Sequence, residues 1–176
     1  MKEVKNKTGI LFWITGLSGS GKSSVSNKII NRIRKIYGPT LLLSGDDIRK
    51  VFVLNSYSKH DRRKYALQYS LLCKKLTNQN INVIFSTMSL FHQIRFWNKK
   101  NIKKYVEIYI KADIKKIIKK KKKFFYRKKS DNVIGVNIKP ELPKSPDIII
   151  KNDFKKNINE LAEELLKKIN SHLLTK

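Results

Sequence analysis

A glycine-rich loop with a single lysine is the first part of the chain whose residues could do chemistry. The stretch GLSGSGKSS (residues 16–24) fits the pattern Gly16-x-x-x-x-Gly21-Lys22-Ser23 and directly follows the apolar run GILFWIT. In a phosphate-binding loop of this kind, backbone N–H groups surround phosphate oxygens, the lysine reaches the β- and γ-phosphates, and the serine ligates Mg²⁺. We therefore predict an ATP site with Mg²⁺ held at Ser23 and with Lys22 in a catalytic role. The predicted ATP-binding residues are Gly16, Ser18, Gly19, Ser20, Gly21, Lys22, Ser23 and Ser24.

A second candidate is the acidic pair in LSGDDIR (residues 43–49), which follows another apolar run. In phosphoryl transfer a carboxylate can take the proton of an attacking hydroxyl or hold the metal. The alternative is that Asp46 and Asp47 only cap the helix that follows. An acid pair and an arginine beside a phosphate loop favour chemistry.

The elements that must position these residues alternate along the chain. Apolar runs typical of buried strands occupy residues 9–16, 40–45, 81–86, 105–110 and 147–153. Helical spacing of apolar residues, or helix start and stop signals, mark residues 22–38, 46–52, 60–79, 90–101, a segment that begins at 113, and 154–174. Strands that alternate with helices predict an α/β fold of three layers, with a five-stranded parallel sheet of the P-loop NTPase, nucleotide-kinase-like type.

Length predicts a single domain over residues 1–176. Its least regular segment, residues 124–146, carries three of the four prolines. A segment of this length without periodicity inside a compact domain is usually functional, and we predict that it forms a lid.

The formal charge of +27 raises the alternative of a basic P-loop protein that binds nucleic acid. Only seven of the 40 basic residues are arginine, and only residues 115–129 form a dense basic block. We favour a solvated basic surface, with a small-molecule nucleotide as partner and no specific nucleic acid. A P-loop regulator that binds nucleotide without transferring phosphate is a further alternative, and it would tolerate loss of Asp46.

The sequence says less about the cellular location and the oligomeric state of the protein. No apolar run approaches the roughly 20 residues of a membrane span, so we expect no membrane partner. The apolar run near the N-terminus leads into the glycine loop and is typical of a first strand, not of a cleaved signal. With Cys73 as the single cysteine, we expect a reducing, cytoplasmic location and leave a homodimer open.

The order of five segments resembles the adenylylsulfate (APS) kinase family, whose members phosphorylate the ribose 3′-hydroxyl of a nucleotide with ATP. The segments here are GLSGSGKSS, LSGDDIR, HDRR, TMSLF and VIGVNIKPELPKSPDIII, and they span most of the chain. The resemblance implies that Asp46 is the catalytic base or positions the 3′-hydroxyl. It also implies that Arg49 and Arg62 grip the anionic end of the acceptor, and that Ser89 matches the family serine after the third strand.

The departures from the family pattern gather on the acceptor side. Ser44 and Asp47 replace an aspartate and an asparagine, Tyr65 replaces an asparagine, and Val133 replaces the lid phenylalanine. The phosphate loop, by contrast, is intact. The resemblance therefore implies a changed acceptor, as in the branch that serves surface-polysaccharide loci and phosphorylates cytidine diphosphoramidate; ordinary adenylylsulfate is the alternative. The predicted acceptor-binding residues are Arg49, Arg62, Tyr65, Ser89 and Val133, and Tyr65 as a plain core residue stays an alternative.

Overall fold

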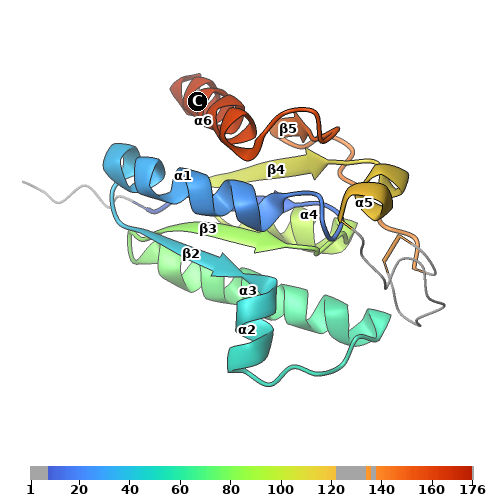
Figure 1. Cartoon of the computed structure of the whole chain (residues 1–176). Coiled ribbons are helices and arrows are strands. Elements are labelled where there is room, and N and C mark those ends of the chain that lie inside the picture. The colour runs from blue at the N-terminus through green and yellow to red at the C-terminus, as the bar shows by residue number, and fades with distance from the viewer. Residues whose placement is uncertain (1–7, 122–133, 136–137, 176) are drawn as a thin grey trace, which may run out of the picture.

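The computed structural model describes residues 8–121, 134–135 and 138–175 (Figure 1). Its strands are β1 (Leu11–Thr15), β2 (Thr40–Ser44), β3 (Asn82–Thr87), β4 (Tyr105–Lys111) and β5 (Ile148–Lys151). Its helices are α1 (Lys22–Tyr37), α2 (Gly45–Val51), α3 (Lys59–Asn78), α4 (His92–Asn101), α5 (Ile114–Lys121) and α6 (Ile158–Leu174). The predicted alternation of strands and helices is thus observed, with bounds shifted by a few residues at most.

All five strands pair in parallel, in the order β2-β3-β1-β4-β5. The phosphate loop leaves β1, the central strand, so it lies at the middle of the sheet's carboxyl edge. Since carboxyl ends of parallel strands meet at one edge, the turn after β2 and the loop after β3 lie at the same edge as the phosphate loop. The predicted α/β fold with a five-stranded parallel sheet is confirmed.

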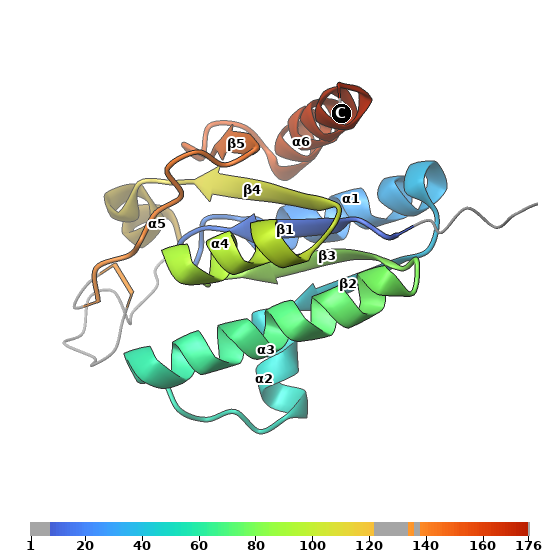
Figure 2. The same ribbon diagram turned by 180° about the vertical axis from the view of Figure 1, so that it is seen from behind.

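Helices cover both faces of the sheet and give three layers. Helices α1 and α6 pack together over one face, and α3 and α4 cover the other, as the two opposite views show (Figures 1 and 2). Alternate residues of β1 serve the two sides: Phe12 and Ile14 join the core under α1 and α6, whereas Leu11 and Trp13 join the core under α3 and α4. A strand buried on both faces needs a continuous apolar run, which explains the composition of β1.

The apolar face of α1 follows its predicted spacing with one exception. Val25, Ile29 and Ile33 are fully buried against the sheet. Ile36 was predicted on the same face, but it is 52% exposed, so that part of the prediction is wrong. Ile36 lies in the last turn of α1, where the next residue, Tyr37, packs against the core in its place and donates its hydroxyl to Asn170 Oδ1 of α6 at 2.7 Å.

The buried face of α3 also differs from the prediction. Tyr65, Tyr69, Leu72 and Leu76 share a face by spacing, yet the buried residues are Ala66, Tyr69, Ser70, Cys73 and Thr77. Small residues let the helix approach the sheet closely. The two buried hydroxyls are satisfied within the helix, where Ser70 Oγ donates to the Ala66 carbonyl at 3.1 Å and Thr77 Oγ1 to that of Cys73 at 3.0 Å. Polar residues can therefore occupy this face.

A third, smaller apolar cluster lies at the carboxyl edge of the sheet. It joins Leu17 of the phosphate loop, Leu90 after β3, Ile117 of α5 and Ile134.

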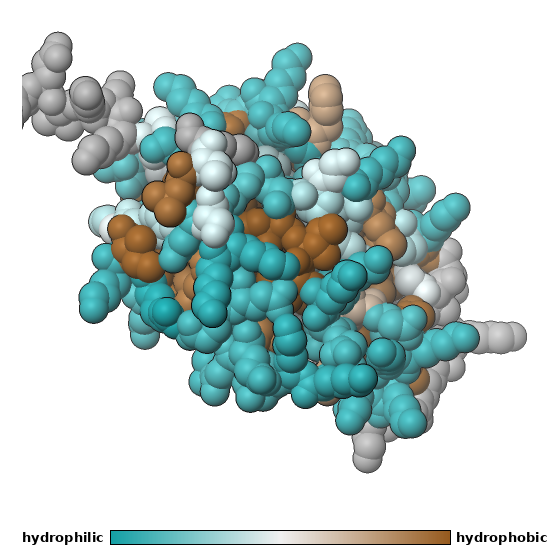
Figure 3. Space-filling model, turned by 90° about the horizontal axis from the view of Figure 1, so that it is seen from above, coloured by the Kyte–Doolittle hydropathy of each residue, from teal (hydrophilic) through white to brown (hydrophobic). Residues whose placement is uncertain are grey.

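The surface seen from the α6 side is largely hydrophilic, with hydrophobic areas gathered near its middle (Figure 3). Within the described ranges, no helix combines the length and the apolar character that crossing a membrane requires.

Candidate active site

The phosphate loop has a backbone shape that only glycine allows at two positions. Gly16 has φ 152°, and a Cβ there would lie 2.5 Å from the Ile110 carbonyl oxygen. Gly21 has φ 101° at the N-terminal end of α1, and a Cβ would lie 3.0 Å from Asn152 Nδ2. The loop therefore presses its backbone against β4 and the residue after β5, and α1 begins without a side-chain cap. Such an uncapped N-terminus can direct its N–H groups at phosphate oxygens.

Lys22 and Ser23 begin α1, directly after the glycines of the phosphate loop. Lys22 is buried, and its Nζ donates to the Leu17 carbonyl at 2.8 Å, across the loop. Ser23 Oγ lies 3.4 Å from Ser86 Oγ near the end of β3. Of the other predicted ATP-binding serines, Ser20 is buried and Ser24 is exposed.

Asn152, which the sequence analysis did not single out, supports the phosphate loop. Its carboxamide donates to the Ser20 carbonyl at 2.9 Å and accepts from the Phe154 N–H at 3.0 Å, and the side chain is buried. The bond to Ser20 fixes the peptide unit that precedes Gly21. Because this contact joins residues 132 positions apart, no local pattern announces it.

The two aspartates after β2 differ in their surroundings. Ser44 is the N-cap of α2: its Oγ accepts from the Asp47 N–H at 3.1 Å and donates to Asp47 Oδ2 at 2.6 Å. Capping, one of the two predicted roles of the acid pair, is thus performed by Ser44 and not by either aspartate; the Asp47 carboxylate only accepts from the Ser44 hydroxyl. Asp46 lies exposed in the first turn of α2. Gly45 brings this turn close to β3, since a Cβ there would lie 3.1 Å from Thr87 Oγ1.

Two arginines and two tyrosines form what we call the acceptor cluster: Arg49, Tyr57, Arg62 and Tyr65. The Arg49 guanidinium lies 4.1 Å from the centre of the Tyr57 ring and 5.4 Å from that of Tyr65. The Arg62 guanidinium lies 5.0 Å from the Tyr57 ring. Backbone carbonyls fix both cations, since Arg49 Nη2 donates to Ser56 and Arg62 Nε to Tyr57, each at 2.9 Å. The sequence analysis named three of these residues and missed Tyr57, which stands five residues before Arg62.

The electrostatics show that Asp46 belongs with this cluster. Burial lowers the pKa of Arg62, the positive charge of Arg49 lowers it further, and the negative charge of Asp46 acts in the opposite direction. Tyr69 is buried next to the cluster. Burial raises the pKa of its hydroxyl, whereas the positive charge of Arg49 acts to lower it. Two neighbouring guanidinium groups and one carboxylate leave a net positive site, which suits an anionic ligand.

Tyr65 packs on the core, as one of its two predicted roles requires, while its predicted role in acceptor binding stays a prediction. Its ring packs partly buried against the apolar core under α3, and the same ring faces Arg49. Ser89 is buried and, within the described residues, its Oγ has no hydrogen-bond partner, while its carbonyl oxygen accepts from Thr15 Oγ1 at 3.5 Å. Val133 and most of the predicted lid, residues 124–146, lie outside the described residues; of that segment the structure describes 134–135 and 138–146.

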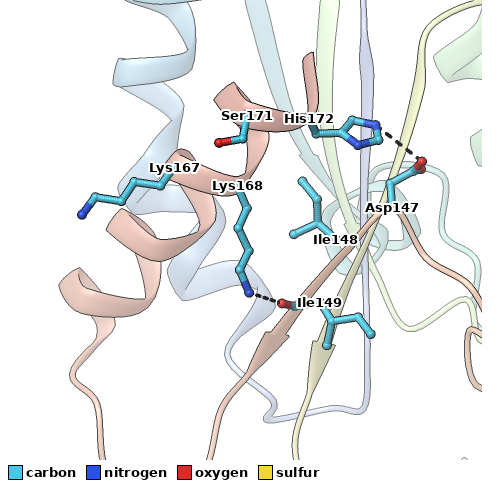
Figure 4. A pocket seen from close by; sticks show the side chains of 7 residues that line it. All are labelled: Asp147, Ile148, Ile149, Lys167, Lys168, Ser171 and His172. Atoms are coloured by element: carbon cyan, nitrogen blue, oxygen red, sulfur yellow. Dashed lines mark hydrogen bonds and ion pairs between the residues drawn. The ribbon is translucent and has the colours of Figure 1, made fainter. Parts of the chain in front are cut away.

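A shallow groove elsewhere on the molecule lies between β5 and α6 (Figure 4). His172 pairs with Asp147 at 3.5 Å, and Lys168 Nζ donates to the Ile149 carbonyl at 2.8 Å. These polar groups bind one another and do not converge on a common point (Figure 4). The described residues contain no group of three or more His, Cys, Asp or Glu side chains suited to a metal ion. We therefore place the candidate active site at the carboxyl edge of the sheet.

Known proteins resemble the chain along nearly its full length. The family model for adenylylsulphate kinase matches residues 8–151. A cytidine diphosphoramidate kinase from Campylobacter jejuni is 34% identical over 170 residues, which is 94% of this chain and 99% of that protein. An adenylyl-sulfate kinase from Clostridium kluyveri is 30% identical over 155 residues, 85% of this chain and 78% of the relative.

A solved structure agrees with the fold. The APS kinase CysC of Mycobacterium tuberculosis, in complex with AMPPNP and APS, has a TM-score of 0.80 at 24% identity, over 93% of this chain and 98% of that one. This likeness concerns the fold alone, whereas the family model and the relatives identify the family. The chain, a P-loop phosphotransferase, therefore belongs to the adenylylsulphate kinase family.

Proposed function

We propose that this kinase transfers the γ-phosphoryl group of ATP to the ribose 3′-hydroxyl of a nucleotide, most specifically cytidine diphosphoramidate. The observation that carries the proposal is that Asp46 lies three residues before Arg49 on α2 and that its charge acts on the pKa of Arg62, at the sheet edge where the phosphate loop lies. A hydroxyl with an anionic group nearby fits this arrangement, since the carboxylate meets the hydroxyl and the cations meet the anion.

On the donor side the phosphate loop would hold ATP. The N–H groups between Gly16 and Ser24 and the start of α1 would surround the phosphates. Lys22 would leave its bond to the Leu17 carbonyl and reach the β- and γ-phosphates. Asn152 would keep the Ser20 carbonyl turned away from them.

Mg²⁺ fits the hydroxyl oxygens present. This ion keeps several waters and takes only one or two protein ligands together with phosphate oxygens. Ser23 Oγ would hold it, and Ser86 Oγ, 3.4 Å away, lies within reach of a bound water. When bound, the ion neutralises charge that develops on the phosphate oxygens.

On the acceptor side, the 3′-oxygen would attack the γ-phosphorus in line with the bond to the β–γ bridging oxygen. The new P–O bond forms as the bridging P–O bond breaks, ADP leaves, and the hydroxyl proton passes to the Asp46 carboxylate. Arg49 and Arg62, whose guanidinium groups both lie over the Tyr57 ring, would hold the diphosphoramidate end.

The choice of cytidine diphosphoramidate rests on the Campylobacter jejuni relative, whose name states that substrate. Adenylylsulfate is the second candidate, favoured by the Clostridium kluyveri relative. The test is an ADP-release assay with the two nucleotides side by side. Turnover of the cytidine compound at least tenfold above that of adenylylsulfate is expected; strong turnover of adenylylsulfate alone would overturn the proposed substrate.

The remaining predictions stay part of the proposal. We propose one catalytic domain over residues 1–176 that acts in the cytoplasm, with the segment 124–146 as a lid that is anchored to α3 and α4 at Glu141. A nucleic-acid-binding role would give salt-sensitive oligonucleotide binding at physiological ionic strength, and we expect none. Light scattering on a sizing column would show whether the chain is the homodimer that the sequence analysis left open.

A further inference from the structure

Glu141 joins three elements, of which one, α3, carries two members of the acceptor cluster. Its Oε1 lies 3.0 Å from Arg63 Nη2 on α3, and its Oε2 accepts the His92 N–H at 2.6 Å at the start of α4. Its backbone N–H donates to the Leu90 carbonyl at 3.1 Å, and its own carbonyl accepts from Arg95 Nη2 at 2.7 Å. One residue of the segment that leads to β5 therefore contacts α3, the loop after β3, and α4.

Helix α4 depends on this residue for its N-terminal cap. Phe91 occupies the cap position without a side-chain hydrogen bond, and the first turn of α4 contains no acidic residue. The first N–H groups of a helix need acceptors, and a carboxylate suits that positive end. Glu141 supplies one from 49 positions away. Burial raises the pKa of Glu141, but the bonds from His92 and Arg63 outweigh burial and hold the pKa below its ordinary value.

The contacts of Glu141 stand next to two predicted acceptor residues. Arg63 follows Arg62 on α3, and Leu90 follows Ser89 in the loop after β3. The Arg63 guanidinium also lies 5.4 Å from the Phe91 ring, which keeps this side chain turned toward α4. Arg62 and Arg63 are consecutive residues of α3. The contact of Arg63 with Glu141 therefore fixes how this turn of the helix is rotated, and so the direction in which Arg62 points.

We propose that Glu141 is a positioning residue for the acceptor side, which fixes α3 against α4 through Arg63 and His92. The inference rests on the proposed function, since it assigns the Arg62 side of the pocket to the acceptor. It predicts that Glu141 governs the binding of the acceptor and leaves that of ATP unchanged.

Substitution Glu141→Gln separates the two contacts. The amide oxygen can still accept the His92 N–H, while the charge that holds Arg63 is lost; Glu141→Ala removes both. We expect the KM for the acceptor to rise about fivefold in E141Q and further in E141A, with the KM for ATP changed less than twofold. Glu163→Gln is the matched control, because Glu163 pairs with Arg32 on the exposed surfaces of α6 and α1, and both KM values should stay unchanged.

Arg63→Met should reproduce E141Q, and the double variant should add nothing, since both changes remove one interaction. An equal rise of both KM values, or a fall in Tm with neither KM changed, would show a merely structural role and overturn the proposal. Wild-type turnover decides the proposed function by itself. The KM of each variant divided by the KM of the wild type, measured with whichever nucleotide the wild type phosphorylates, decides the role of Glu141.

Discussion

The donor side and the acceptor side of this site are built in different ways. The phosphate loop is made of backbone, and Lys22 is held by a carbonyl five residues away. The acceptor cluster is made of side chains from α2, α3 and the loop between them, and it is braced by contacts such as Arg63–Glu141, which joins residues 78 positions apart.

The difference teaches where such an enzyme can change. A loop that Ile110 and Asn152 press from behind has no room for a Cβ at Gly16 or Gly21. Side chains on helix surfaces can be replaced one at a time while the helices stay in place. The departures from the family pattern therefore fall on the side that is free to vary, and acceptor choice can evolve while ATP binding persists. If the two sides are independent, a variant on one side should change the KM of only one substrate.

The largest effect is expected from Lys22→Ala. The buried ammonium is the one charge that the loop itself directs at the phosphates, so turnover should fall about 10³-fold. ADP release at saturating acceptor measures the loss, and a thermal melt checks that the fold persists. Activity within tenfold of wild type would show that the loop does not carry the donor chemistry.

Asp46→Asn should lower kcat about 10²-fold and leave the KM for ATP unchanged, because it removes the proposed proton acceptor. Asp47→Asn is the matched control: it removes only the charge of the carboxylate that accepts from Ser44 Oγ, keeps the backbone cap of α2, costs about 0.5–1.5 kcal/mol in the free energy of unfolding, and retains kcat. Equal kinetic effects in the two variants, or an unchanged kcat in D46N, would contradict the assignment, whereas a regulator that transfers nothing would show no turnover even in the wild type.

Arg62→Lys should raise the KM for the acceptor about tenfold, because a lysine cannot reproduce a guanidinium that stacks on Tyr57 and donates to a carbonyl. The KM for ATP should stay within twofold. Arg32→Lys, on the exposed surface of α1, makes the same change without a kinetic effect. A rise in the KM for ATP of similar size would mean that Arg62 serves the donor.

Asn152→Ala tests whether a change at the phosphate loop affects ATP binding alone. Loss of the bond to the Ser20 carbonyl should raise the KM for ATP about fivefold and leave that of the acceptor unchanged. Together with E141Q it forms a pair with opposite kinetic signatures. If both variants raise the same KM, the two sides are not independent.

The smallest expected effect concerns pH. Burial raises the pKa of Glu107 to about 7, and the Arg95 guanidinium, 3.0 Å away, opposes the rise. The folded state then binds a proton that the unfolded state releases near pH 4.5. Glu107 therefore contributes stability that is fully present at low pH and is lost as pH rises toward 7.

Urea melts of the wild type and Glu107→Gln at pH 5 and 7.5 measure this contribution. The wild type should lose more stability than E107Q between these values, because only the carboxyl titrates. Asp147 and Lys99, which also act on the pKa of Glu107, are the same in both proteins and cancel in the difference. Parallel pH dependence of the two proteins would show that Glu107 does not titrate in this range.

Strands and helices were largely predictable because their signals are local. Buried strands need apolar runs, and helices end where glycine or proline follows. The buried face of α3 could not be predicted in the same way. Ser70 and Thr77 can be buried there because their hydroxyls donate to carbonyls of the helix, and these hydrogen bonds exist only once the helix has formed. Ile36 also differs from its spacing, since Tyr37 and not Ile36 packs against the core in the last turn of α1.

By itself, the sequence determined the phosphate loop, the order of the strands along the chain and thereby the class of fold, since each depends on residues that are neighbours in the chain. The tertiary structure alone decided that Asn152 braces this loop, that the Tyr57 ring contacts both Arg49 and Arg62, and that Glu141 joins α3 to α4. These contacts exist only once the parallel sheet has brought distant turns to one edge, and no spacing along the chain encodes the distance between two side chains that fold together.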